Sequence, residues 1–257
     1  MTMIPFAEVV RRTRPPVRRS ELPDFFGLID QQARVVVSLA KAAGEVLQGK
    51  ESARSVRLFD LEQRRQELRR RNQAAVESLF GFAAGAEEIQ WTMDSLDQAA
   101  ARLFRTAADF SQWPSGVDDA VREMMAIILR ASESLQQGYI GLASGWPLGE
   151  IDVGQAMGSR DMLGSHRAMA LRELLQTGSA PVLPPEQGFP APLPPAANDR
   201  ERWLHELYAS LDNIAQHLAS AAGILRRWSL RLSAGLNDLE AGLFGASSLL
   251  CHKLVTV

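Results

Sequence analysis

Apolar residues recur at alternating steps of three and four along most of this chain. The longest unbroken run lies between residues 199 and 231, and its members are Leu204, Leu207, Leu211, Ile214, Leu218, Ala221, Leu225 and Trp228. This spacing places one apolar stripe along an α-helix and is typical of a helical bundle or coiled-coil seam. We therefore expect a long helix here, which begins with Asn198-Asp199 as its cap.

Residues 56–110 predict two helices separated by a break at residues 80–85. The second helix carries acidic residues in its first turn, Glu87 and Glu88, which suit a helix N-terminus. Its apolar stripe consists of Ile89, Met93, Leu96, Ala100, Leu103, Ala107 and Phe110. A short break predicts that the two helices pack as an antiparallel pair. Asp97 borders the stripe, where a charge without a partner is costly.

The first helix of this pair has an apolar side and a strongly basic side. The side predicted to be buried holds Leu58, Leu61, Leu68, Ala75 and Leu79, and the predicted outer side holds Arg64, Arg65, Arg69, Arg70 and Arg71. Acidic residues interleave with the arginines, namely Asp60, Glu62 and Glu67. This pattern favours pairing of opposite charges on a solvated helix face over a nucleic-acid interface.

The remaining pattern predicts three more helices and no strands. A helix starts at Pro23-Asp24 and stops near Gly49, and another carries Val117, Val121, Met124, Ile128, Leu135 and Tyr139 on one face. Glycines between residues 138 and 164 weaken the helical signal, so we expect a loop over 140–148 and a helix over 152–176. The predicted fold class is therefore all-α, an antiparallel bundle of about six main helices.

Three segments differ in composition from the bundle, which spans residues 21–231. Residues 1–20 contain five arginines and predict a basic flexible arm, either a solvated tail or a contact for anionic lipid or an acidic partner. Residues 178–197 are rich in proline and predict an extended linker, with a PxxP partner site as the alternative. Residues 232–257 predict an amphipathic tail that caps the bundle or packs on a second copy.

Composition places the chain among ordinary globular proteins. Hydrophobic residues make up 46% and charged residues 23% of the sequence, and the net charge is −2. A single cysteine excludes an internal disulfide framework and a multi-cysteine zinc site. The apolar stretch near the N-terminus precedes the arginines, the reverse of a signal peptide. We expect a cytoplasmic protein whose membrane contact, if any, is peripheral.

No pattern in the sequence indicates catalysis. The four histidines (His166, His205, His217 and His252) have no cysteine or carboxylate neighbour in metal-ligand spacing. Neither a Gly-x-Ser-x-Gly elbow nor a phosphate-binding glycine loop occurs. We therefore expect neither enzymatic activity nor an organic cofactor.

Three groups of residues resemble one known family, the PhoU-like Pit accessory proteins. Phe80, Glu87-Glu88-Ile89 and Leu96-Asp97 are similar in order and spacing to the family's helix-break-helix segment. Asp24-Phe25-Phe26 and the stretch from Asp30 to Ala33 resemble its opening helix. Trp203 to Arg231, with Leu211-Asp212 inside it, resembles its last helix. The resemblance covers roughly residues 21–231 and matches poorly in the Gly-rich and Pro-rich parts.

The resemblance implies a PhoU-like bundle of two similar halves that accompanies a low-affinity phosphate permease. The function it implies is non-enzymatic, an accessory or regulatory protein of inorganic phosphate transport that contacts a membrane permease. The alternative is a helical scaffold or interaction protein that kept the fold and lost the metal sites. The heptad-like seams also suggest a homo-oligomer.

Many members of the family carry pairs of acidic residues four positions apart, and this chain keeps one acid of each pair. The retained acids are Glu62, Asp97, Asp161 and Asp212, and the partner positions are occupied by Gln66, Ala101, Met157 and Tyr208. The resemblance implies that the four acids are candidate ligands for one divalent or iron-type metal ion. The alternative is that they form hydrogen bonds and ion pairs, with Arg65 and Arg69 neutralising those nearby.

Overall fold

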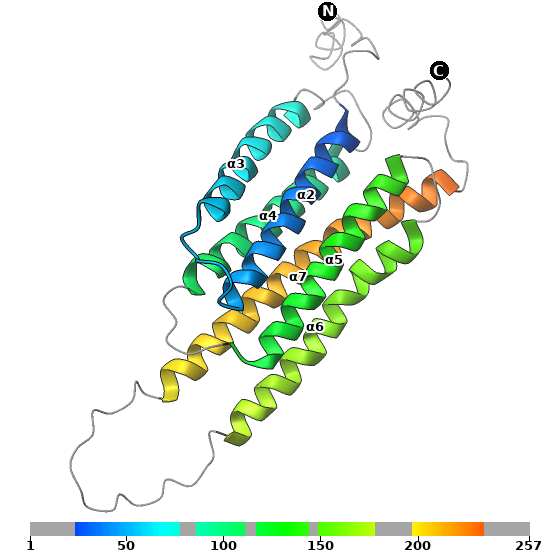
Figure 1. Cartoon of the computed structure of the whole chain (residues 1–257). Helices are drawn as coiled ribbons and strands as arrows, with labels where there is room; N and C mark the ends of the chain where they lie inside the picture. Colours follow the sequence, from blue (N-terminus) through cyan, green and yellow to red (C-terminus); the bar gives the residue numbers. More distant parts are fainter. Residues whose placement is uncertain (1–23, 78–85, 111–116, 144–148, 178–196, 234–257) are drawn as a thin grey trace, which may run out of the picture.

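Six α-helices make up most of what a computed structural model of the chain describes, residues 24–77, 86–110, 117–143, 149–177 and 197–233 (Figure 1). They are α2 (Phe25–Leu47), α3 (Val56–Glu77), α4 (Ala86–Phe110), α5 (Asp119–Ala143), α6 (Gly149–Thr177) and α7 (Ala197–Ser233). These ranges contain no strand. The predicted all-α fold of about six helices is confirmed.

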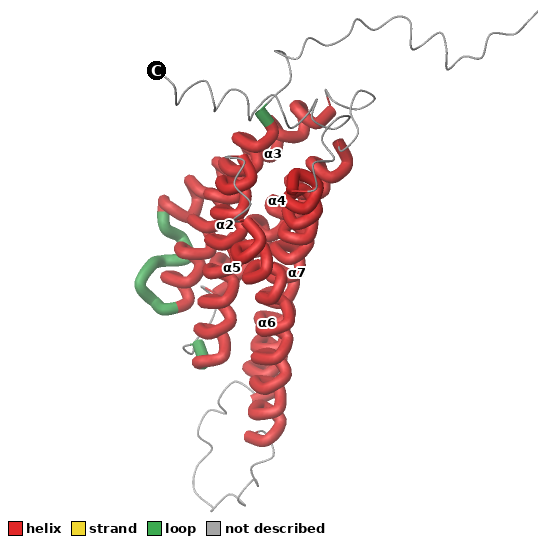
Figure 2. Tube along the Cα trace, turned by 90° about the vertical axis from the view of Figure 1, so that its right-hand side faces the viewer, coloured by secondary structure: helices red, strands yellow, loops and turns green. Residues whose placement is uncertain are grey.

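The helices form two halves of three. Helices α2, α3 and α4 pack on one another, and α5, α6 and α7 do the same. The halves meet where α2 contacts α5 and where α4 contacts α7, while α3 and α6 each pack mainly within their own half. Successive helices run in opposite directions, and α6 reaches farther toward the bottom of both views than α2–α4 (Figures 1 and 2).

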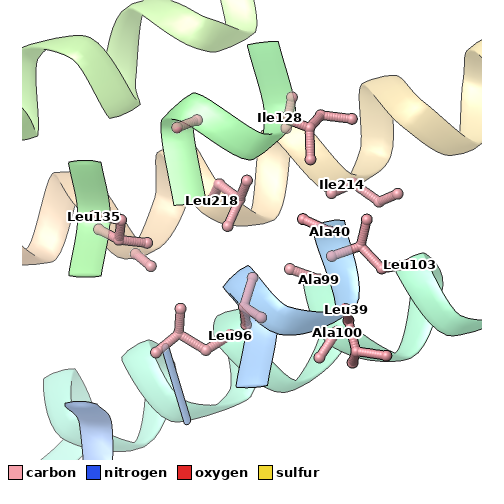
Figure 3. Packing of buried hydrophobic residues seen from close by; sticks show 14 of the residues in the cluster. Leu39, Ala40, Leu96, Ala99, Ala100, Leu103, Ile128, Leu135, Ile214 and Leu218 are labelled. Atoms are coloured by element: carbon pink, nitrogen blue, oxygen red, sulfur yellow. The ribbon is translucent and has the colours of Figure 1, made fainter. Parts of the chain in front are cut away.

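The hydrophobic core lies where the four inner helices meet. Figure 3 shows it at the residues Leu39 and Ala40 of α2, Leu96, Ala99, Ala100 and Leu103 of α4, Ile128 and Leu135 of α5, and Ile214 and Leu218 of α7. Each of these side chains is at most 1% exposed. Alanines let the helix backbones approach closely, and the larger side chains fill the space between them. The predicted apolar stripes of α4, α5 and α7 supply this core.

Local signals define both ends of α2. The Asp24 carboxylate accepts a hydrogen bond of 3.0 Å from the backbone N–H of Gly27, the geometry of a helix N-cap. Beyond Leu47, Gly49 adopts a φ of +70°, which glycine accommodates without strain and which stops the helix. The predicted start and end of this helix are confirmed.

The predicted loop over 140–148 is wrong at its start, because α5 continues to Ala143. The packing at Gly138 shows why the helix contains a glycine at this position. A Cβ atom there would lie 2.7 Å from Cδ2 of Leu225 on α7. The absent side chain lets α5 and α7 pack closely, and the Tyr139 hydroxyl donates to the carbonyl of Ala221 at 3.3 Å. Packing against α7 offsets the low helix propensity of glycine.

The other predicted boundaries shift by a few residues. Helix α6 begins at Gly149, slightly before the predicted residue 152. Helix α7 already begins at Ala197, so Asn198 and Asp199 lie within its first turn, and their predicted role as the cap is wrong. The basic arm, the break at 80–85, nearly all of the Pro-rich insert and the tail from residue 234 lie outside the described residues.

No helix within the described ranges is long and apolar enough to cross a membrane.

Truncation of Leu218 to alanine should reveal how much the junction between the halves contributes to stability. Leu218 is fully buried, so we expect Leu218→Ala to lower the free energy of unfolding by about 2–5 kcal/mol. Urea denaturation followed by circular dichroism measures this change. Leu230→Ala is the matched control, because Leu230 is 47% exposed on the same helix and its truncation should change stability by less than about 0.5 kcal/mol. Equal effects of the two substitutions would contradict this core.

Candidate functional site

A buried arginine joins two of the four predicted site residues between α3 and α4. Arg65 holds Glu62 with two hydrogen bonds, from Nε to Oε2 at 2.8 Å and from Nη2 to Oε1 at 2.7 Å. Its Nη1 donates to Oδ1 of Asp97 on α4 at 2.5 Å. Arg65 is 8% and Asp97 3% exposed, so the contact is nearly free of water. From the solvent side, Nη1 of Arg69 lies 3.5 Å from Oδ2 of Asp97.

The prediction that Arg65 lies on the outer side of its helix is therefore wrong. Asp97 faces α3 from the apolar stripe of α4, and a buried carboxylate needs a positive partner. Leu58, Arg65 and Asn72 follow one another at steps of seven and are all buried. This seven-residue repeat can be seen in the sequence, and it indicates that Arg65 lies on the same side of the helix as the apolar Leu58. Arg64, Arg70 and Arg71 are exposed, as predicted for the outer side.

Electrostatics favour the charged forms of this cluster. Burial alone raises the pKa of Glu62, but hydrogen bonds from Arg65 and Gln66 and the charges of Arg65 and Arg105 outweigh it and lower that pKa. The hydrogen bond to Glu62 raises the pKa of Arg65; burial opposes this rise, and the charge of Asp97 reinforces it. Glu62 and Arg65 are therefore both charged at neutral pH.

Next to this network lies a polar cavity of about 230 Å³ between α2, α3 and α4. Its lining is contributed by Gln32, Arg69, Asn72, Gln73, Val76, Glu77, Gln90, Met93, Asp94 and Asp97. Nε2 of Gln32 donates to the carbonyl of Met93 at 2.8 Å, and Nδ2 of Asn72 donates to Oε1 of Gln32 at 3.0 Å. Two buried amides thereby tie α3 to α2 and α2 to α4.

The hydrogen bond between these two amides was not predicted from the sequence. Gln32 lies in the stretch from Asp30 to Ala33 that resembles the family's opening helix, but Asn72 is 40 positions away and nothing in the sequence links the two. Both are buried, with 3% and 2% exposure. Only the seven-residue step from Arg65 to Asn72 hinted that Asn72 faces inward.

Asp94 lies at the mouth of the cavity, one turn before Asp97. Burial raises the pKa of Asp94, and the charge of Asp97 raises it further, although Arg69 partly counteracts both. This acidic side chain escaped the sequence reasoning because the pattern of α4 marks it as a solvent-facing position.

The other two predicted site residues lie in the second half of the bundle. Asp161 is exposed on α6. Asp212 on α7 is half-buried and accepts a hydrogen bond of 3.1 Å from Nη1 of Arg167 on α6. Within the described part of the chain, no three histidine, cysteine or acidic side chains gather closely enough to hold a metal ion. The arrangement of Glu62, Asp97 and Asp212 fits the ion-pair alternative, and metal binding stays a prediction of the resemblance.

A second, more open groove of about 550 Å³ runs between α4 and α7. Trp91, Asp94 and Gln98 line it from α4, and His217 and Arg227 from α7. Trp91 is 66% exposed at its edge. Burial, assisted by the charge of Arg102, lowers the pKa of His217, so this imidazole is neutral at pH 7.

Comparisons of the chain with protein-family models, with curated proteins and with solved structures found no match.

Replacement of Arg65 should lower the free energy of unfolding more than replacement of an arginine in an exposed ion pair. Arg65→Met leaves the Asp97 carboxylate buried beside Arg69 alone, so we expect a loss of about 3–5 kcal/mol in the free energy of unfolding. Urea denaturation at pH 7 measures it. The control is Arg202→Met, because Arg202 is 81% exposed in its pair with Glu206 and its loss should matter by less than about 1 kcal/mol. Similar losses in the two variants would show that the buried ion pair stabilises the fold no more than an exposed one.

The lowered pKa of Glu62 makes its contribution depend on pH. A carboxyl whose pKa is lower in the folded than in the unfolded chain stabilises the fold above its ordinary pKa of 4.5, and this gain disappears as the pH falls through the folded value. We expect wild type to exceed Glu62→Gln in stability at pH 7, and the difference to shrink below pH 4.5. Urea midpoints of both proteins between neutral and acid pH test this. A difference that stays constant with pH would refute it.

Proposed function

We propose that this chain is a non-enzymatic accessory protein of inorganic phosphate transport, which acts through contact with a membrane permease. The observation that carries the proposal is the doubled three-helix architecture. The resemblance implies a bundle of two similar halves, and here α2 and α5, α3 and α6, and α4 and α7 occupy corresponding places in the two halves. The order and spacing of the resembling motifs along residues 21–231 support the same assignment.

In this proposal the contact with the permease is peripheral and electrostatic. Helix α3 packs mainly against α2 and α4, so its outer side is accessible, and Arg64, Arg70 and Arg71 are exposed on it. The basic arm at residues 1–20 adds five arginines to the charge available for an acidic cytoplasmic loop or anionic lipid headgroups. The proposed location is the cytoplasmic face of the inner membrane.

The Arg65 contacts favour a second candidate, a helical scaffold that kept the fold and lost the metal sites. Glu62 and Asp97 are the acids retained at the positions where the family carries its pairs, and the chain's own guanidinium contacts both of them. A cation supplied by the protein meets the charge requirement that a metal ion would otherwise meet. On this alternative the protein binds other soluble proteins or a second copy of itself.

Affinity capture from detergent-solubilised native membranes distinguishes the two candidates. We expect the full chain to retain a phosphate permease, identified by mass spectrometry, and a chain without residues 1–20 to retain less of it. The shortened chain keeps all six helices, so an unchanged circular dichroism spectrum serves as its folding control. Recovery of soluble partners only would favour the scaffold. Phosphate uptake that is unchanged in a deletion strain would reject the transport role.

A further inference from the structure

The polar cavity between α2, α3 and α4 contains a buried acceptor whose orientation is fixed. Gln32 donates through Nε2 to the Met93 carbonyl, so its Oε1 must accept. Asn72 therefore turns Nδ2 toward Gln32, and its Oδ1 is left as an acceptor. That oxygen is buried and has no hydrogen-bond partner among the described residues. An unpaired buried amide oxygen is costly, so a donor group that enters the cavity can gain a hydrogen bond to Asn72.

A negative charge accompanies this acceptor. Asp94 lines the cavity and forms no ion pair within the described ranges, whereas the Asp97 carboxylate is already held by Arg65 and approached by Arg69. Glu77 accepts a hydrogen bond from Gln73 at 3.0 Å. The cavity thus offers the Asp94 carboxylate and the amide oxygen of Asn72, and both accept hydrogen bonds.

The remaining walls suit a short hydrocarbon chain. Val76 and Met93 are 3% and 4% exposed and line the cavity alongside the polar groups. The volume of about 230 Å³ is well above the roughly 30 Å³ that one water molecule occupies in the liquid. A bare divalent ion favours several carboxylate ligands, and no three acidic, histidine or cysteine side chains gather for one within the described residues.

We propose that this cavity binds a small primary ammonium compound, whose N–H groups donate to the Asp94 carboxylate and to Oδ1 of Asn72 and whose carbon chain lies against Val76 and Met93. The proposal is independent of the role in phosphate transport. A primary ammonium offers three donors and one positive charge, which match the amide oxygen of Asn72 and the Asp94 carboxylate, an acid without an ion pair in the described ranges.

Calorimetric titration of the full chain with propylammonium chloride and with 1,4-diaminobutane tests this site. We expect saturable binding of both amines at one site. Tetramethylammonium chloride at the same ionic strength should not bind, because it carries the charge and lacks the N–H donors. No saturable heat with either primary amine, or equal binding of tetramethylammonium, would overturn the proposal.

Substitutions locate the binding. Asp94→Asn should weaken amine binding by at least about tenfold, because the substitution removes the negative charge that strengthens the hydrogen bond to the ammonium group. Asp94 is exposed at the mouth of the cavity, so this variant should fold, and urea denaturation verifies that. Val76→Phe, which fills the cavity, should abolish binding in a protein that still shows a cooperative unfolding transition. Asp109→Asn is the matched control, because Asp109 is exposed on α4 and does not line the cavity. Equal affinities of the Asp94 and Asp109 variants would exclude this site.

Discussion

The contact between Arg65 and Asp97 determines how α3 is attached to the rest of the bundle. Helix α3 buries three apolar side chains, Leu58, Leu68 and Val76, and two polar ones, Arg65 and Asn72. Its position therefore depends on polar contacts to a degree that the other helices do not share. A buried ion pair is specific in geometry, because either partner alone would be an uncompensated charge. The amide contact of Asn72 with Gln32 fixes the same helix against α2.

The four inner helices form a different kind of structure. Helices α2, α4, α5 and α7 meet through apolar side chains (Figure 3). The absence of a side chain at Gly138 of α5 leaves room for Leu225 of α7. The molecule thus has a buried apolar core, and its outer helix α3 is attached through an ion pair and an amide hydrogen bond. The polar cavity lies between α3 and the inner helices α2 and α4. Most of the side chains that α3 contributes to its lining are polar. Both the function and the ligand proposed for this protein involve α3.

The sequence predicted the inner helices well and the polar contacts poorly, for a physical reason. Steps of three and four between apolar residues report which face of a helix is buried, and they placed Leu96, Ile128 and Leu218 correctly in the core. Arg65 was placed on the outer side because it belongs to a run of arginines, although the seven-residue repeat of Leu58, Arg65 and Asn72 indicated that it faces inward. Asp97 beside an apolar stripe indicated that a cation was needed, and the ion-pair alternative named Arg65 and Arg69, which are the two arginines that contact it. The Gln32–Asn72 contact joins positions that no local pattern relates.

Hydrogen exchange measured by mass spectrometry on wild type and Arg65→Met tests most directly whether the Arg65–Asp97 contact attaches α3. The experiment compares the protection of backbone amides in each helix under native conditions. The account predicts that the substitution lowers protection in α3 and in the part of α4 around Asp97, while α5, α6 and α7 keep theirs. Unchanged protection of α3, or an equal loss in both halves, would contradict it.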